Sequence, residues 1–421
     1  MMGVYRQFVS FGWPSRMLMI NQFGINLGFY MLMPYLAGYL AGPLGLAAWV
    51  IGLVLGIRNF SQQGMFIVGG TLADRFGYKP LIVAGCLLRT VGFGLLVVAH
   101  SLPVLVIASA ATGFAGALFN PAVRAYLAAD SGPRRLEAFA LFNVFYQAGI
   151  LAGPLAGLAL MAVDFRVAAT VAAVVFAVLT IAQLFALPQH AAQPATGEKT
   201  AVIEDWRTVL ANRSFVCFAV AMIGSYVLNF QVYLALPLHA ASIAPEHSAA
   251  LVAAVFVVSG AVAVGGQLRL TRWFADRWGN GRALVIGMTI LAASFLPLLI
   301  VPTAGRFGTV PAVAALLLAA ALLAVGSAAV FPFEMDTVVS LARDRLVATH
   351  YGFYNTIVGV GILAGNLATG SLLQAARNAG ADELLWGGLV MVGLIAATAL
   401  HLLDRRGHLS APLEPAVAQR R

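Results

Sequence analysis

The sequence is poor in charged residues, in lysine and in cysteine. Only 10% of its 421 residues are charged and 61% are hydrophobic, whereas about a quarter are charged in a typical soluble domain. A water-soluble fold of this size could not bury so much apolar surface, so lipid must be one of the solvents of the chain. The two lysines, Lys79 and Lys199, follow Tyr78 and Glu198. A phosphate-binding loop ending in Gly-Lys-Ser/Thr is therefore missing, which excludes an ATP-driven pump.

Metal and redox chemistry have little support either. The two cysteines, Cys86 and Cys217, lie inside apolar segments and form neither a disulfide framework nor a metal-ligand spacing. The histidines include no HExxH pair, so we predict no metal and no other cofactor. The net charge of +9 does not indicate nucleic-acid binding, because the basic residues are scattered through short loops.

Long apolar segments dominate the chain. A helix needs about 20 residues to cross the hydrocarbon core, whereas strands of a membrane barrel would show alternation over about ten residues. The twelve predicted spans are 17–41, 47–71, 80–99, 103–125, 138–162, 166–187, 214–240, 248–270, 283–303, 311–340, 348–375 and 384–403. The predicted domains are an N-terminal six-helix bundle (1–187), a cytoplasmic linker with a short amphipathic helix (188–213), a C-terminal six-helix bundle (214–405) and a cytoplasmic tail (406–421).

The basic residues predict the orientation. With a cytoplasmic N-terminus, 20 of the 25 Lys and Arg residues lie on the cytoplasmic side, and Arg166, Arg306 and Arg377 lie on the other. Cytoplasmic loops carry an excess of Lys and Arg. The 23 arginines against two lysines, together with much alanine, suggest a GC-rich bacterial genome. We therefore expect a multi-pass protein of a bacterial inner (plasma) membrane with both termini in the cytoplasm.

The two halves are related copies. LADRFGYKPLIVAG begins at Leu72, and FADRWGNGRALVIG begins 202 residues later at Phe274. GILAGPLAG begins at Gly149, and GILAGNLATG begins 212 residues later at Gly361. Parallel six-helix repeats related by an axis along the membrane normal are a known transporter plan. We therefore predict two pseudo-symmetric six-helix bundles.

The loop after the second span resembles the signature of the major facilitator superfamily. Its pattern is Gly70-x-x-x-Asp74-Arg75-x-Gly77-x-Lys79, and the second-half copy is degenerate. The resemblance implies the all-α fold with 12 transmembrane helices and a cytoplasmic latch that is made and broken during transport. In that latch, Asp74 would cap a neighbouring helix and pair with basic groups. The candidate latch and gate residues are Gly70, Asp74, Arg75, Gly77, Lys79, Arg124, Asp130, Asp276 and Arg277.

A second motif, in the fifth span, resembles that of the drug/proton antiporters in this family. It consists of Gly149, Gly153, Pro154 and Gly157. Glycines at this spacing let helices approach closely, and proline removes a backbone hydrogen bond, so helix packing is the alternative interpretation. Two positions depart from the group. Asn21 stands where several members carry an acid, and Ser109 stands where many have an arginine.

Polar side chains inside the spans are candidates for a substrate cavity. Span seven carries three of them on one helical face, and span one carries three more. The alternative is interhelical hydrogen bonding, at about 0.6 kcal/mol per bond. The cavity candidates are Gln22, Asn26, Tyr30, Arg58, Gln62, Asn120, Tyr226, Asn229, Tyr233 and Asn355.

Charged side chains within the spans have several possible roles. Glu334 and Asp336 are proton-coupling candidates, because an acidic group removed from water is easier to protonate. The alternative is a structural ion pair near the inner surface, and a bridge from Arg124 to either acid could close an inner gate. Arg58 could bind an anionic group of a substrate or hold helices together, and for Arg58 and Arg89 the structural role is favoured.

These observations favour a secondary active exporter of small amphipathic, drug-like molecules that works by proton antiport and alternating access. The expected partners are a small-molecule substrate, protons and the lipid bilayer, without nucleic acid, and the expected state is a monomer. A carrier of an anionic metabolite or lipid, by uptake or flipping, is the alternative. A membrane enzyme has less support, because no catalytic set of residues is found in the spans, and we predict that the chain is not an enzyme.

Overall fold

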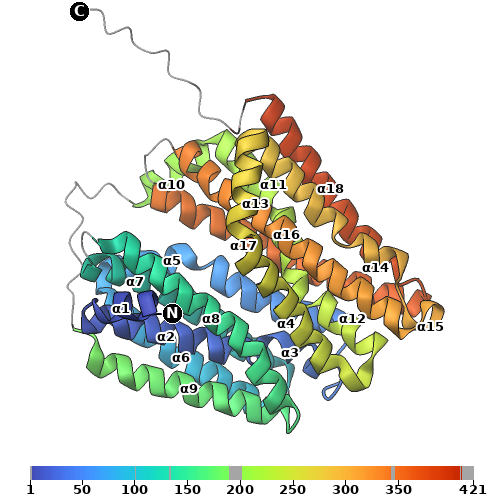
Figure 1. Ribbon diagram of the computed structural model, residues 1–421, viewed down its shortest axis with the longest axis horizontal. Coiled ribbons are helices and arrows are strands. Elements are labelled where there is room, and N and C mark those ends of the chain that lie inside the picture. The colour runs from blue at the N-terminus through green and yellow to red at the C-terminus, as the bar shows by residue number, and fades with distance from the viewer. Residues whose placement is uncertain are drawn as a thin grey trace, which may run out of the picture.

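The computed structural model describes residues 2–99, 101–131, 134–188, 202–342, 347–407 and 409, and this part of the chain is helical without a strand (Figure 1). The N-terminal group comprises α1 (Met2–Val9), α2 (Trp13–Tyr30), α3 (Met33–Ala41), α4 (Ala48–Gln63), α5 (Phe66–Phe76), α6 (Tyr78–Val98), α7 (Leu102–Ser131), α8 (Arg135–Met161) and α9 (Phe165–Ala186). The C-terminal group comprises α11 (Arg213–Asn229), η2 (Phe230–Tyr233), α12 (Ala235–Ile243), η3 (Pro245–His247), α13 (Ser248–Ala293), α14 (Leu296–Ile300), α15 (Ala304–Phe307), α16 (Thr309–Ala342), α17 (Val347–Ala379) and α18 (Glu383–Arg405). The predicted all-α membrane fold is confirmed.

The first two predicted spans are not continuous helices. Ten helices of the described part are long and apolar enough to cross a membrane, whereas spans one and two are each built from two shorter helices. α2 ends at Tyr30 because Pro34 lacks the N–H that would bond to the Tyr30 carbonyl, and its ring clashes there. α4 and α5 are separated at Gly64 and Met65, and glycine is a weak helix former.

The linker region is partly described. Residues 189–201 lie outside the described residues, and α10 (Val202–Ala211) is the short helix that the sequence predicts there. Of the tail, only 406, 407 and 409 are described.

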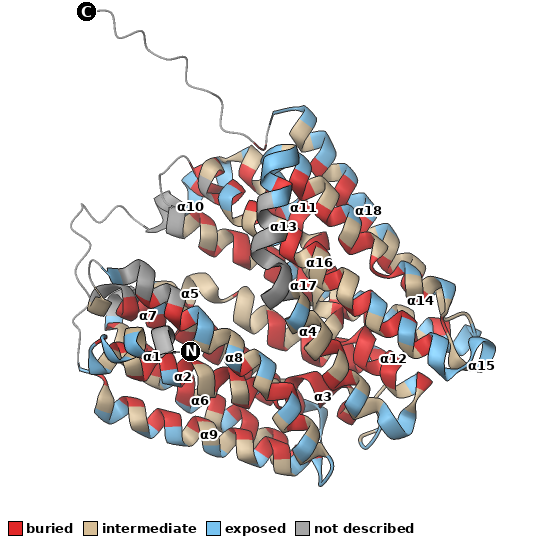
Figure 2. Cartoon of the chain, viewed as in Figure 1, coloured by how far each residue is buried: buried red, intermediate tan, exposed pale blue. Residues whose placement is uncertain are grey.

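The apolar outer surface of the molecule fits a lipid environment. Figure 2 shows buried residues along the facing sides of the helices and exposed residues along the outer sides of α9 and α18. On α9, Val174, Val178, Ile181 and Phe185 are exposed at a spacing of three or four residues, which puts them on one helical face. An exposed apolar stripe of this kind is stable against lipid.

The two groups of helices touch along α4 and α17. A Cβ atom on Gly52 would lie 2.3 Å from the Asn366 carbonyl oxygen, and one on Gly359 would lie 2.5 Å from the Gly64 nitrogen. The groups also meet between α3 and α12, and between α8 and α13. Figure 1 shows them close together near α3 and α12 and diverging toward the end that holds α1 and α10. Because Gly52 and Gly359 have no Cβ atom, α4 and α17 can pack backbone against backbone where the two groups touch.

Equivalent glycines form the turns in both copies of the repeated loop. Gly77 separates α5 from α6 with φ of 87°, and Gly279 makes the turn between spans eight and nine, within α13, with φ of 67°. The two positions are 202 residues apart, as in the sequence repeat. Both glycines have ψ near 180°, a region that is essentially restricted to glycine and costs a residue with a Cβ atom about 1–3 kcal/mol. The glycine of the repeat is therefore required by the turn itself.

We predict that Gly77→Ala destabilises the protein by about 1–3 kcal/mol through this backbone strain. Thermal unfolding of the purified protein in neutral detergent measures the effect. Gly94→Ala is the matched control, because Gly94 is helical in α6 and its added methyl group would meet nothing within 4 Å. Equal unfolding temperatures for the two variants would contradict the assigned role of the turn.

Candidate functional site

A central cavity of about 340 Å³ lies between the two groups of helices. Three of the sequence candidates, Tyr30, Asn229 and Tyr233, line it. The lining residues are Tyr30, Gln147, Ile150, Asn229, Val232, Tyr233, Phe256, Ser259, Gly260, Leu323, Ala324, Ser327, Ala328 and Phe331. The wall therefore combines apolar and aromatic surface with a few uncharged polar groups, which suits an amphipathic small molecule.

Two tyrosines connect the halves beside this cavity. α2 ends at Tyr30 and η2 ends at Tyr233, each four residues before a proline, Pro34 and Pro237. The Tyr233 hydroxyl donates a hydrogen bond to the Tyr30 hydroxyl at 3.3 Å. The Phe256 ring packs against both tyrosine rings, with centroids 6.2 and 5.7 Å away. The proline-induced helix ends therefore place one polar contact between the halves at the centre of the molecule.

Glu334 is buried in the C-terminal group and held by two tyrosines. Its side chain is 3% exposed, and its Oε1 atom accepts hydrogen bonds at 2.7 Å from the hydroxyls of Tyr226 and Tyr354. Tyr226 lies three residues before the cavity residue Asn229, and Glu334 lies three residues after Phe331. The carboxyl group thus sits about one helical turn from the central cavity. Uncharged hydroxyl donors can hold either protonation state of a carboxyl group.

Asp336 has different surroundings, although it lies on the same helix. It is exposed, and its carboxylate accepts a hydrogen bond from the side-chain amide of Asn280, beside the Gly279 turn. Arg124 is also exposed, and among the described side chains it makes no ion pair with Glu334 or Asp336. The Arg124 bridge remains a prediction for a conformation in which the inner ends come together.

Arg58 and Arg89, which we call the arginine pair, are buried in the N-terminal group at 5% and 4% exposure. Arg58 donates hydrogen bonds to Asn59 at 2.5 Å and to Gln62 at 2.7 Å, and its guanidinium lies 4.4 Å from the centre of the Phe29 ring. Arg89 lies over the rings of Phe29 and Phe176 at 5.7 and 5.6 Å. Within the described part of the chain, neither arginine has an acidic partner.

Several predicted cavity residues bond within the helix bundle. Asn26 donates to the Tyr146 carbonyl at 2.8 Å, and Asn355 donates to the Tyr351 carbonyl at 2.8 Å. Seven of the ten candidates are not among the residues that line the central cavity. These seven are Gln22, Asn26, Arg58, Gln62, Asn120, Tyr226 and Asn355. Their role in lining a cavity remains a prediction.

The latch residues are partly described. The side chains of Asp74 and Arg75, at the end of α5, lie outside the described residues. Asp130 accepts a hydrogen bond at 2.6 Å from Ser15, which ties the end of α7 to the start of α2. The others lie along or beside the two repeated loops, where Gly70 is in α5, Lys79 is near the start of α6, and Asp276 and Arg277 are exposed before the Gly279 turn. The latch itself remains a prediction.

The antiporter-type motif packs α8 against α2 and α3. A Cβ atom on Gly149 would lie 2.6 Å from the Phe23 carbonyl oxygen, and one on Gly157 would lie 2.2 Å from the Met31 carbonyl oxygen. The Pro154 carbonyl accepts a hydrogen bond from the Tyr35 hydroxyl at 2.6 Å. In the second copy, Cβ atoms on Gly361 and Gly365 would lie 2.3 and 2.4 Å from side-chain atoms of α11. The repeated glycines therefore pack equivalent pairs of helices.

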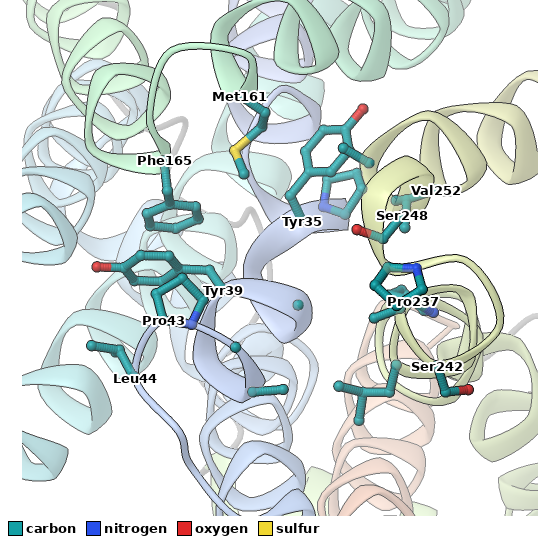
Figure 3. A pocket seen from close by; sticks show the side chains of 18 of the residues that line it. Tyr35, Tyr39, Pro43, Leu44, Met161, Phe165, Pro237, Ser242, Ser248 and Val252 are labelled. Carbon is teal, nitrogen blue, oxygen red and sulfur yellow. The ribbon is translucent and has the colours of Figure 1, made fainter.

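A larger cavity of about 900 Å³ lies between α3, the start of α9, α12 and the start of α13. Figure 3 shows Tyr35, Tyr39 and Phe165 on one side of it and Pro237 and Ser248 on the other. The Tyr39 and Phe165 rings are stacked 3.8 Å apart at an angle of 6°. Both groups of helices line this cavity, so any relative movement of the groups would change its size.

Several residues of these sites were not among the sequence candidates. Gln147, Ser259 and Ser327 line the central cavity, and Tyr354 holds Glu334. Gln147, Ser259 and Ser327 are neutral polar residues outside the polar stripes that mark spans one and seven. A signal was available for Tyr354, because it follows Tyr351 at a spacing of three residues near the start of span eleven.

The family model of the Major Facilitator Superfamily matches residues 18–411. An uncharacterized MFS-type transporter of Mycobacterium tuberculosis is 66% identical over 403 residues, which cover 96% of each chain. Multidrug resistance protein MdtH of Salmonella newport is 30% identical over 384 residues, which cover 91% of this chain and 92% of that protein.

Solved structures resemble the fold at low sequence identity. A mutant of the nucleoside transporter NupG has a TM-score of 0.74 and 14% identity, covering 92% of this chain and 99% of that chain. The POT family transporter PepTSo has a TM-score of 0.76 and 16% identity, covering 94% of this chain and 98% of that chain. At these identities the likeness concerns the fold alone.

Proposed function

Because the chain belongs to the major facilitator superfamily, we propose that it is a secondary active transporter that exports small amphipathic, drug-like molecules by proton antiport. The observation that carries the proposal is Glu334, a buried carboxyl group held by two neutral hydroxyls about one helical turn from the central cavity. A carboxyl group in such a place can exchange a proton without needing a cation as its partner. The similarity to MdtH supports the substrate class.

The proposed mechanism is alternating access around the central cavity. The two helix groups rock against each other, and the Tyr30–Tyr233 hydrogen bond breaks when their contact near the cavity opens. Proton binding at Glu334 and cargo binding in the cavity would favour different arrangements of the halves, which couples the two flows. Because the Tyr30–Tyr233 bond is the long one at 3.3 Å, we expect it to break more easily than the bonds to Glu334.

We further propose a location in a bacterial inner membrane with both termini in the cytoplasm, as a monomer. The excess of basic residues on one side supports this orientation. Labelling of single cysteines placed near Asp74 and Asp276 tests the orientation. Accessibility from opposite sides of the membrane would overturn both the orientation and the parallel repeat.

The export function is tested with purified protein in lipid vesicles and an imposed pH gradient. We expect amphipathic dyes and drugs from a panel of different charges to move against the direction of proton flow. The flux should reverse when the gradient is reversed and stop when a protonophore collapses it. Flux of the same size with and without the gradient would contradict proton antiport and indicate facilitated diffusion instead.

A further inference from the structure

Among the described side chains, the arginine pair has no counter-charge in its own half of the protein. The sequence has no Asp or Glu between residues 1 and 73, 75 and 129, 138 and 163, or 165 and 197. The acids of the N-terminal half are therefore Asp74, Asp130, Glu137 and Asp164, all near the ends of predicted spans. Every acceptor bonded to Arg58 is a neutral amide oxygen, and the Nε atoms of both arginines are buried without a hydrogen-bond partner.

A purely structural role fits this arrangement poorly. The two guanidinium groups lie 4.4 and 5.7 Å from the centre of the same Phe29 ring, and like charges repel more strongly away from water. Two buried cations are costly to maintain unless an anion compensates them. In the C-terminal half, Glu334 is bonded to tyrosines instead. Its position therefore does not supply the missing anion.

Arg58 is separated from the central cavity by one aromatic side chain. Its guanidinium lies 4.4 Å from the centre of the Phe29 ring, and the Phe29 ring lies 5.1 Å from that of Tyr30, which lines the cavity. The Tyr30 hydroxyl also accepts the hydrogen bond from Tyr233 that joins the halves. At Gly116 of α7 a Cβ atom would lie 3.1 Å from Gln62 and 3.3 Å from an Arg89 nitrogen, so α7 packs closely against the pair on that side. An acidic group would therefore reach Arg58 from the side of Phe29 and Tyr30, once Tyr30 separates from Tyr233.

We propose that the arginine pair is an anion subsite for the cargo, which is therefore an amphipathic molecule carrying a carboxylate or a comparable acidic group. The inference rests on the proposed transport function and specifies its substrate class. Arg58 contacts the acidic group through its guanidinium, and Arg89 adds a second positive charge behind it. The apolar part of the cargo then lies against the aromatic wall formed by Tyr30, Tyr233 and Phe256.

The test compares a fluorescent rhodamine that carries a free carboxylic acid with its methyl ester, which lacks the negative charge and is larger by one methyl group. Binding to the purified full-length protein is measured by fluorescence polarisation in neutral detergent without lipid. We expect the wild type to bind the acid at least about ten-fold more tightly than the ester. Arg58→Gln should remove this preference by weakening acid binding, and it should leave ester binding within about two-fold.

Two further variants control the experiment. Arg58→Lys keeps the charge but loses the two-pronged geometry, so it should retain part of the preference. Arg306→Gln makes the same charge change at an exposed position of α15, next to Glu383, and should keep the full preference. Equal binding of acid and ester by the wild type, or no binding of either, overturns the subsite. Loss of acid and ester binding to the same extent in a folded Arg58→Gln protein also overturns it.

Two more measurements separate the remaining explanations. If Arg58→Gln does not fold, the unfolding temperature of the wild type tests the subsite. The acid should raise this temperature more than the ester does, and equal shifts would contradict the subsite. Titration with phosphatidylglycerol should leave acid binding unchanged, whereas competition would assign the subsite to a lipid headgroup and overturn the cargo assignment. Gradient-driven flux of both dyes in phosphatidylcholine vesicles reports the transport function separately. If the pH gradient drives no flux while acid binding still depends on Arg58, proton antiport is contradicted and the anion subsite is supported.

Discussion

Replacement of Glu334 by glutamine is expected to abolish transport driven by a pH gradient while leaving cargo binding nearly intact. Glutamine has the shape of glutamate, and its side-chain oxygen can still accept the hydrogen bonds from Tyr226 and Tyr354. It cannot release a proton, so proton flow can no longer be exchanged for cargo. We expect gradient-driven flux in vesicles to fall at least about ten-fold, as for removal of a general acid–base group, and cargo affinity in detergent to change by less than about three-fold.

The neighbouring acid provides a sharp comparison. Asp336→Asn changes an exposed group that bonds to Asn280 at the inner end of α16. Its loss can slow the movement of the halves, but the remaining flux should still depend on the gradient. If flux lost its dependence on the pH gradient in Asp336→Asn and kept it in Glu334→Gln, the proton site would be assigned to Asp336 instead of Glu334.

The sequence alone indicates that the Glu334 and Asp336 carboxyl groups have different surroundings. Consecutive residues of an α-helix are turned by about 100°, so positions 334 and 336 point in directions about 200° apart. One of them must face the bundle if the other faces away from it. Composition does not tell which, because the choice depends on where α11 and α17 bring Tyr226 and Tyr354.

The membrane fold and the family followed directly from the sequence, because they depend on long apolar runs and on a loop motif of fixed spacing. The family prediction is confirmed, and so is the prediction that the chain is not an enzyme. The sequence analysis did not identify the interruptions within spans one and two. Pro34 already indicated a break at Tyr30, because a proline disrupts the bond to the carbonyl four residues earlier. The same argument applied to Pro237 and Tyr233.

The central cavity could be predicted only in part. Tyr30, Asn229 and Tyr233 belonged to polar stripes along single helices, so helical periodicity found them. Gln147, Ser259 and Ser327 come from three different spans and share a wall only after the halves have packed. No pattern along one helix identifies such residues.

A second large effect is expected for Gly153→Ala in α8. The added methyl carbon would lie 2.5 Å from the Tyr30 Cβ atom and 3.0 Å from the Tyr30 carbonyl carbon, so the backbone of α2 would have to move. We expect a loss of about 1–3 kcal/mol in the free energy of unfolding, as for other overpacked cores. Denaturation in neutral detergent measures it. Gly365→Ala, its repeat partner, should cost less, because the three nearest atoms all belong to the side chain of Val227.

The same variant separates the two interpretations of the glycine and proline motif. Gly153 packs directly on Tyr30, which carries one end of the hydrogen bond between the halves. If the motif serves only packing, the folded fraction of Gly153→Ala should transport cargo with the wild-type dependence on the pH gradient. If it takes part in antiport, displacement of Tyr30 should weaken the contact with Tyr233, and flux should become less dependent on the gradient. Unchanged stability together with unchanged coupling would contradict both interpretations, because the close contact of α2 and α8 requires either the stability or the coupling to change.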